Sequence, residues 1–190
     1  RKKKSSFFDS RTTAIAEGSR NFLNKIGLWK NISKYTEKIK NIKVIDRDES
    51  NKINFFNNFK NNNLGYVVKN LKLIAIIKSL LSKKRNVIFY YGTKLLFIEY
   101  KSEKVVGVFN DKKISSKLLL AADGKHSTVR KVLNTPIFKK EYQEDALVVN
   151  FFHTYKHNNT AYEFFYKSGP LAILPMQSKG LRYQSSIIWS

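Results

Sequence analysis

The sequence has no cysteine, one methionine and three prolines, and it has 14 acidic residues against 36 lysines and arginines. The absence of cysteine excludes a disulfide scaffold, a thiolate nucleophile and a cysteine-based metal site. The sequence also lacks an apolar run long enough to cross a bilayer, because its most apolar stretch, residues 71–81, is interrupted by Lys72 and Lys78. The scarcity of acidic residues leaves a formal net charge of +22.

This positive charge is spread along the chain and does not identify a partner. Only residues 1–4 and 83–85 form short basic runs, and Asn and Ile are also abundant, with an Asn run at 61–63. Lys, Asn and Ile together are typical of an A+T-rich coding sequence, so we favour a compositional origin for a solvated basic surface. Attraction to an anionic membrane face and binding of nucleic acid are the alternatives, and the scattered distribution predicts no nucleic-acid partner.

The sequence contains enough apolar residues to form a core, since hydrophobic residues make up 42% of its 190 residues. The patterns predict a strand and a helix ending near Gly27, short strands around residues 44–45 and 55–56, a strand over 65–69, and a helix over 71–82 capped by Asn70. Strand-like runs at 86–91, 94–100 and 105–109 predict a small antiparallel meander. Four more strands are predicted at 146–155, 161–167, 171–176 and 182–189, so the fold class is α/β.

The segment most suggestive of chemistry runs from Leu118 to Arg130. Its apolar start, residues 118–122, predicts a strand buried on both faces, as in a parallel sheet. Asp123 and Gly124 then form a turn, and a helix begins at Ser127 or Thr128. The free N–H groups at the start of this helix predict a phosphate site; the alternative is a plain strand-turn-helix in which Asp123 caps the helix.

Two further segments carry weaker signals. Arg11 precedes a small-residue strand and could hold a phosphate in bidentate fashion, or lie on the surface. Residues 169–176 form an apolar strand that contains Pro170 and Pro175, which predicts a sheet edge or rim. His153 and His157 are four residues apart on a strand and a loop, where we expect surface histidines and no metal site.

Taken in order, these segments resemble the middle of a single-component FAD-dependent aromatic hydroxylase, in the branch that hydroxylates polyprenylated phenols in ubiquinone biosynthesis. The Arg-x-x-Ala-hydrophobic-Ala stretch of that family matches residues 11–16, and its short Gly-x-hydrophobic-Val strand matches residues 65–68. Its Ala-Asp-Gly-x-x-Ser-x-hydrophobic-Arg motif matches residues 122–130, and its Gly-Pro-Leu-Ala stretch matches residues 169–175.

The resemblance implies a Rossmann-like FAD-binding part and an antiparallel substrate-binding sheet, both partial. Residues 1–31 and 64–133 would belong to the FAD part, and residues 32–63 and 134–190 to the substrate part. The cofactor-binding residues that it implies are Arg11, Asp123, Gly124 and Arg130, with Arg130 bracing the motif. No covalent catalytic side chain is implied.

The resemblance also implies the reaction: NAD(P)H reduces FAD, the reduced flavin reacts with O2 to give a C4a-hydroperoxide, and a phenol ring takes the distal oxygen. Because polyprenylated phenols reside in bilayers, a cytoplasmic protein that associates peripherally with the inner face of a membrane is expected. Another aromatic substrate, or a non-catalytic basic binding module from a decayed gene, are the rival interpretations.

The chain departs from the family pattern in three places. No Gly-x-Gly-x-x-Gly turn and no later Gly-Asp motif occurs in it, so we expect a fragment from inside a longer enzyme. Lys69 stands where the family often has an acidic residue after the Val-Val pair.

Overall fold

The computed structural model describes residues 9, 11–46, 51–56, 63–180 and 182–190. The basic run at residues 1–4 and most of the Asn run at 61–63 lie outside the described residues. The chain forms two compact units, one from residues 1–84 and 143–190 and the other from residues 85–142. Its mixture of helices and sheets confirms the predicted α/β class.

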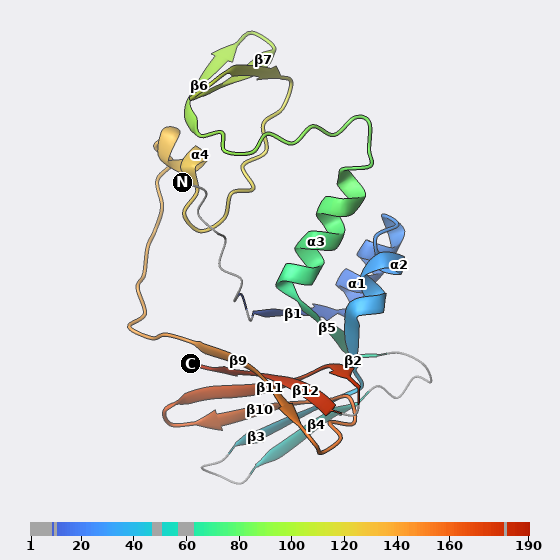
Figure 1. Ribbon diagram of the computed structural model, residues 1–190. Helices are drawn as coiled ribbons and strands as arrows, with labels where there is room; N and C mark the ends of the chain where they lie inside the picture. Colours follow the sequence, from blue (N-terminus) through green and yellow to red (C-terminus); the bar gives the residue numbers. More distant parts are fainter. Residues whose placement is uncertain (1–8, 10, 47–50, 57–62, 181) are drawn as a thin grey trace. The chain divides into compact units, whose positions relative to one another are not determined.

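The first unit contains a small sheet in the order β1-β5-β2 and three helices (Figure 1). β5 (Gly65–Lys69) is the central strand, and it pairs antiparallel with both β1 (Thr12–Ala16) and β2 (Thr36–Ile39). The helical segments are α1 (Glu17–Lys25), α2 (Trp29–Ile32) with the 3-10 turn η1 (Ser33–Tyr35), and α3 (Asn70–Leu81). The predicted bounds of β5 are confirmed, and Gly27 ends the α1 region at a positive φ of 77°.

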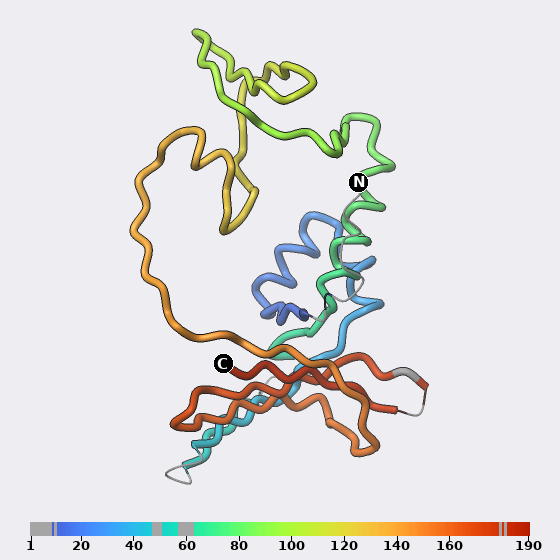
Figure 2. Tube along the Cα trace, turned by 60° about the vertical axis from the view of Figure 1, so that its left-hand side comes forward, coloured from blue at the N-terminus to red at the C-terminus, as the bar shows by residue number. Residues whose placement is uncertain are grey.

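The larger sheet of this unit has the order β4-β3-β10-β11-β12-β9. Its strands are β3 (Asn41–Asp46), β4 (Lys52–Phe56), β9 (Leu147–His153), β10 (Thr160–Tyr166), β11 (Gly169–Lys179) and β12 (Arg182–Trp189). Only the β3–β10 pair is parallel, and it joins segments more than 100 residues apart in sequence (Figure 2). The four strands predicted after residue 136 are confirmed.

β5 is apolar on both faces because it separates two cores. Tyr66 and Val68 pack with Ile15 and Ile32 against the helices, and Ile32 is fully buried. Val67 points the other way and packs with Ile39, Ala161 and Met176 between the two sheets. Successive side chains of a strand alternate between its faces, so one short run serves both cores.

The second unit contains a three-stranded antiparallel meander and one short helix. Its strands are β6 (Leu95–Lys101), β7 (Lys104–Phe109) and β8 (Lys113–Ser116), and its helix is α4 (Thr128–Val132). A three-stranded meander was predicted, but the first of its predicted strands is wrong, because residues 86–91 form no strand. The polar segment 113–116 pairs with the second edge of β7 instead.

Three other predictions are corrected. Residues 118–122 form no strand and are not buried, since Leu118 and Leu120 are 70% and 78% exposed and no described strand pairs with them. Asn70 does not cap α3; Lys69 holds that position, and the Asn70 side-chain oxygen accepts a hydrogen bond from Thr13 instead. β11 is an interior strand of its sheet, and Pro175 is tolerated because the β10 pairing ends at Ile173.

Candidate functional site

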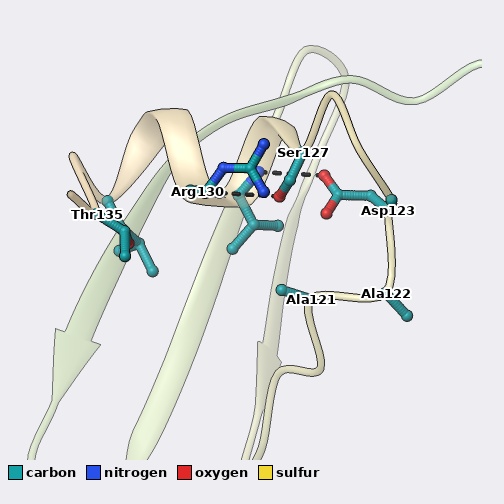
Figure 3. A pocket seen from close by; sticks show the side chains of 9 residues that line it. Ala121, Ala122, Asp123, Ser127, Arg130 and Thr135 are labelled. Carbon is teal, nitrogen blue, oxygen red and sulfur yellow. Dashed lines mark hydrogen bonds between the residues drawn. The ribbon is translucent and has the colours of Figure 1, made fainter. Parts of the chain in front are cut away.

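Three of the four predicted site residues lie around one pocket in the second unit. Asp123, Gly124 and Arg130 line a cavity of about 560 Å³ together with small or apolar neighbours (Figure 3). The remaining lining residues are Ala121, Ala122, Ser127, Val129, Leu133 and Thr135. The motif brings these residues together locally, because all of them lie within 15 consecutive positions of the chain.

Two side chains satisfy the amides at the start of α4. Asp123 Oδ2 accepts hydrogen bonds from the backbone N–H of Thr128 at 2.6 Å and of Val129 at 3.2 Å. The Ser127 hydroxyl oxygen accepts from the N–H of Arg130 at 3.0 Å. The amides that the sequence offered to a phosphate are therefore already bonded, and the alternative expectation, in which Asp123 caps the helix, is the one that the structure shows.

The same contacts set the charge of Asp123. Its hydrogen bond with the Ser127 hydroxyl, together with those from the Val129 and Thr128 amides, lowers the pKa of the carboxyl below its ordinary value, against the opposing effect of burial. Hydrogen bonds to a carboxylate favour its ionised form. The pocket thus presents a fixed negative charge that accepts hydrogen bonds.

Gly124 and Arg130 complete the turn. Gly124 has a φ of 78°, a left-handed conformation that favours glycine, and the space beside its Cα is open. The Arg130 guanidinium donates a hydrogen bond to the carbonyl oxygen of Lys125 within the turn. That contact holds the turn against α4, which is the kind of bracing that the motif implies for Arg130.

Arg11 belongs to the first unit, where it directly precedes β1. Its guanidinium binds the Asp9 carboxylate in bidentate fashion, with Nε and one terminal nitrogen each 2.8 Å from an oxygen. These hydrogen bonds lower the pKa of Asp9 to about 2 and raise that of Arg11. The Arg11 side chain is 69% exposed, so an anion that displaces Asp9 can reach it.

Ser127 is a site residue that the sequence reasoning named only as a helix start. Its hydroxyl links the Asp123 carboxyl to the Arg130 amide, so it fixes two of the predicted residues at once. The signal was available, because Ser three residues before the Arg130 amide is the spacing of a side-chain cap.

The ring centroids of His153 and His157 are 6.3 Å apart, and both rings contact Tyr183. His153 bonds to the Tyr155 carbonyl and the Ser185 hydroxyl, and His157 Nδ1 accepts from the Asn159 amide. Burial, more than any charged neighbour, lowers the pKa of His157. Over the described ranges, no three His, Asp or Glu side chains gather in an arrangement that could hold a metal ion.

Known proteins resemble this chain along nearly its whole length. It is 27% identical to the ubiquinone hydroxylase UbiL of Rhodospirillum rubrum, covering 96% of this chain and 42% of the relative. It is 29% identical to the zebrafish (Danio rerio) ubiquinone biosynthesis monooxygenase COQ6, covering 96% and 40% respectively. The chain thus spans about two fifths of the length of these relatives.

Solved structures share the fold at low identity. Klebsiella pneumoniae HpxO, solved with FAD and uric acid, matches with a TM-score of 0.65 at 14% identity over 93% of this chain and 46% of its own. A variant of Pseudomonas aeruginosa PqsL matches with a TM-score of 0.76 at 13% identity over 94% and 50%. The sequence profile described as FAD binding domain matches residues 1–190, every residue of the chain. The chain therefore belongs to the FAD binding domain family.

Proposed function

We propose that the whole protein is a FAD-dependent monooxygenase that hydroxylates a polyprenylated phenol in ubiquinone biosynthesis, with NAD(P)H and O2 as co-substrates. One observation carries the proposal: relatives from a bacterium and a vertebrate, both named for ubiquinone hydroxylation or biosynthesis, each align with 96% of this chain. Membership of the FAD binding domain family supports FAD as the cofactor.

The Asp123 pocket has the character expected for the hydroxyl-bearing part of FAD. Asp123 presents a carboxylate that accepts hydrogen bonds, and Gly124 leaves its Cα side open for close approach of a ligand. A phosphate fits less well here, because the α4 amides are bonded and the carboxylate would repel it. Arg130 holds the turn in place, and FAD, when bound, supplies the oxidation chemistry.

The remaining assignments are proposals of the same kind. We assign residues 1–31 and 64–133 to the FAD-binding part and residues 32–63 and 134–190 to the substrate-binding part. Arg11 would exchange Asp9 for an anionic group of the cofactor, since a bidentate guanidinium suits phosphate as well as carboxylate.

The substrate class is the least constrained part of the proposal. HpxO shares the fold and was solved with uric acid, so the fold alone does not select a phenol. Hydroxylation of another aromatic compound is therefore the second candidate. No described helix is long and apolar enough to cross a membrane, and we propose that the protein meets its bilayer-borne substrate peripherally.

The test measures the flavin absorbance of the whole purified protein and its NAD(P)H oxidation with and without a polyprenylated phenol. We expect bound FAD and phenol-dependent oxidation. A protein that takes up no FAD would overturn the function, and oxidation stimulated only by other aromatic compounds would favour the second candidate.

The Asp123→Ala variant tests the site separately. Loss of a charged hydrogen-bond partner should weaken FAD binding by about 10- to 100-fold. Asp111→Ala is the matched control, because Asp111 lies at an exposed bend of the same unit and its one ion pair within the described residues is with its neighbour Lys112. Equal FAD affinity in the two variants would remove Asp123 from the site without touching the family assignment.

A further inference from the structure

A second cavity, in the first unit, has no part in the site described above. It lies between the α2–η1 segment and α3, which neighbour each other in Figure 1, and its volume is about 290 Å³. We call it the lysine groove. Its polar lining comprises Asn31, Lys34, Tyr35, Lys72, Ser79 and Lys83. Three lysines thus line a space smaller than the Asp123 pocket.

Among the described residues, no carboxylate forms an ion pair with these three lysines. The sequence contains no Asp or Glu between Glu17 and Glu37, nor between Glu49 and Glu99, so both walls of the groove are free of carboxylates. In the part of the chain that the structure describes, Lys34, Lys72 and Lys83 form no ion pair. Mutual repulsion of like charges is therefore relieved only by solvent or by a bound anion.

The position of Lys72 is not explained by helix stability. Lys72 lies in the first turn of α3, where the helix dipole disfavours a cation, and this turn has no acidic residue. Its ammonium nitrogen instead lies 3.9 Å from the centroid of the Tyr35 ring on the opposite wall. This cation–π contact holds the charge at the groove.

The lining of the groove also contains apolar and neutral polar side chains. Ala75, Ile76 and Leu80 of α3 contribute its apolar part. Asn31 and Ser79 add side chains that can donate neutral hydrogen bonds. A compact anion with several acceptor oxygens suits a lining of this kind, and lysines bind phosphate as point charges.

We propose that the lysine groove binds a phosphate group, held by Lys34, Lys72 and Lys83. The group is either free phosphate or the headgroup of an anionic lipid, and these two sources present the same chemistry to the groove. The exposed Leu71, Ile74 and Leu81 on α3 lie on the element that carries Lys72, where they would contact the bilayer in the second case.

The experiment compares two probes: inorganic phosphate, by titration calorimetry, and phosphatidylcholine vesicles containing phosphatidylglycerol, by co-sedimentation. The decisive variant combines Lys34→Gln, Lys72→Gln and Lys83→Gln. Because each lysine near an anionic surface contributes roughly a fivefold factor, we expect binding to at least one probe to weaken by about a hundredfold.

The matched control combines Lys101→Gln, Lys104→Gln and Lys117→Gln, three exposed lysines of the second unit that remove the same total charge. This control should bind nearly as well as the parent protein. A variant with arginine at the three groove positions should keep its binding, and circular dichroism spectra should match throughout.

The outcomes distinguish free phosphate from a lipid headgroup as the source of the bound phosphate group. Binding of free phosphate, lost only in the groove variant, identifies a soluble phosphate compound as the source. Binding of vesicles alone, lost in the same way, identifies the lipid headgroup. Equal weakening in the groove and control variants, or no binding of either probe by the parent, would overturn the proposal. Either result leaves the FAD proposal untouched, because no groove lysine lines the Asp123 pocket.

Discussion

Residues 65–69 and residues 118–122 are both short runs rich in apolar side chains that lead into a helix, and they lie in opposite surroundings. The first run is β5, paired on both edges and buried on both faces. The second run forms no strand and pairs with no described strand, and Leu118 and Leu120 are largely exposed. Apolar sequence alone therefore does not bury a segment; neighbouring strands and a covering layer are needed as well.

The helices that follow the two runs differ in what stabilises their first turns. α3 has no side-chain cap, and its Leu73 and Ile76 pack against the core beside β5. α4 is one of the shortest helices, and Asp123 and Ser127 bond to its first amides. Packing fixes the start of α3, whereas hydrogen bonds fix the start of α4, and the candidate cofactor site is built on the start of α4.

The largest expected contrast is between truncations in the two runs. Tyr66→Ala should reduce the free energy of unfolding of the first unit by about 3–5 kcal/mol, because the ring is buried and packs edge-to-face on Trp29 at 4.6 Å. Leu120→Ala should change the stability of the second unit by less than about 0.5 kcal/mol.

Hydrogen exchange, followed by mass spectrometry on peptides of β5 and β7, measures both effects in the same chain. Tyr66→Phe is the control, since it keeps the ring and removes only the hydrogen bond from Asn63. If Leu120→Ala accelerated exchange in β7 as strongly as Tyr66→Ala does in β5, residues 118–122 would be buried in solution and the contrast would fail.

A smaller effect is expected from the cap of α4. Ser127→Ala should destabilise this helix by about 1 kcal/mol, which accelerates exchange of the Arg130 amide roughly fivefold. Ser82→Ala, at the far end of α3, removes an exposed hydrogen bond to the Ser79 carbonyl and should leave the exchange of α3 nearly unchanged. Unchanged exchange of the Arg130 amide in Ser127→Ala would mean that α4 is held by packing after all.

These two runs also show where sequence reasoning succeeds. The bounds of β5 follow from local features, since Gly65 and the helix at Asn70 frame an unbroken strand pattern. Residues 118–122 have the same local features, and the pattern could not reveal that no strand pairs with them. The pairing of β7 with the polar β8 was hidden for the same reason.

In the candidate site, too, local sequence predicts some contacts and leaves others unpredicted. Asp123, Gly124 and Arg130 meet because a single turn joins them, so the motif predicts their proximity. The pairing of Arg11 with Asp9 is equally local, but its role toward a cofactor depends on contacts outside the local sequence. The lysine groove could not be predicted, because Lys34 and Lys72 become neighbours only when α3 packs beside η1.

The smallest expected effect is the protonation of Asp123 at low pH, which should change the start of α4 and leave the start of α3 unchanged. Because the folded pKa of Asp123 is below its ordinary value of about 3.9, its cap is fully formed above that pH and is lost as the pH falls through the folded pKa. The NMR amide shifts of Thr128 and Val129 should therefore move only below about pH 3.9. The chemical shifts of the first amides of α3, which no carboxylate caps, should stay constant over this range.

Asp123→Asn keeps an acceptor at the cap and should abolish the titration. A midpoint at or above the ordinary carboxyl pKa would show that these hydrogen bonds do not hold α4 in solution, and the contrast between the two helix starts would fail.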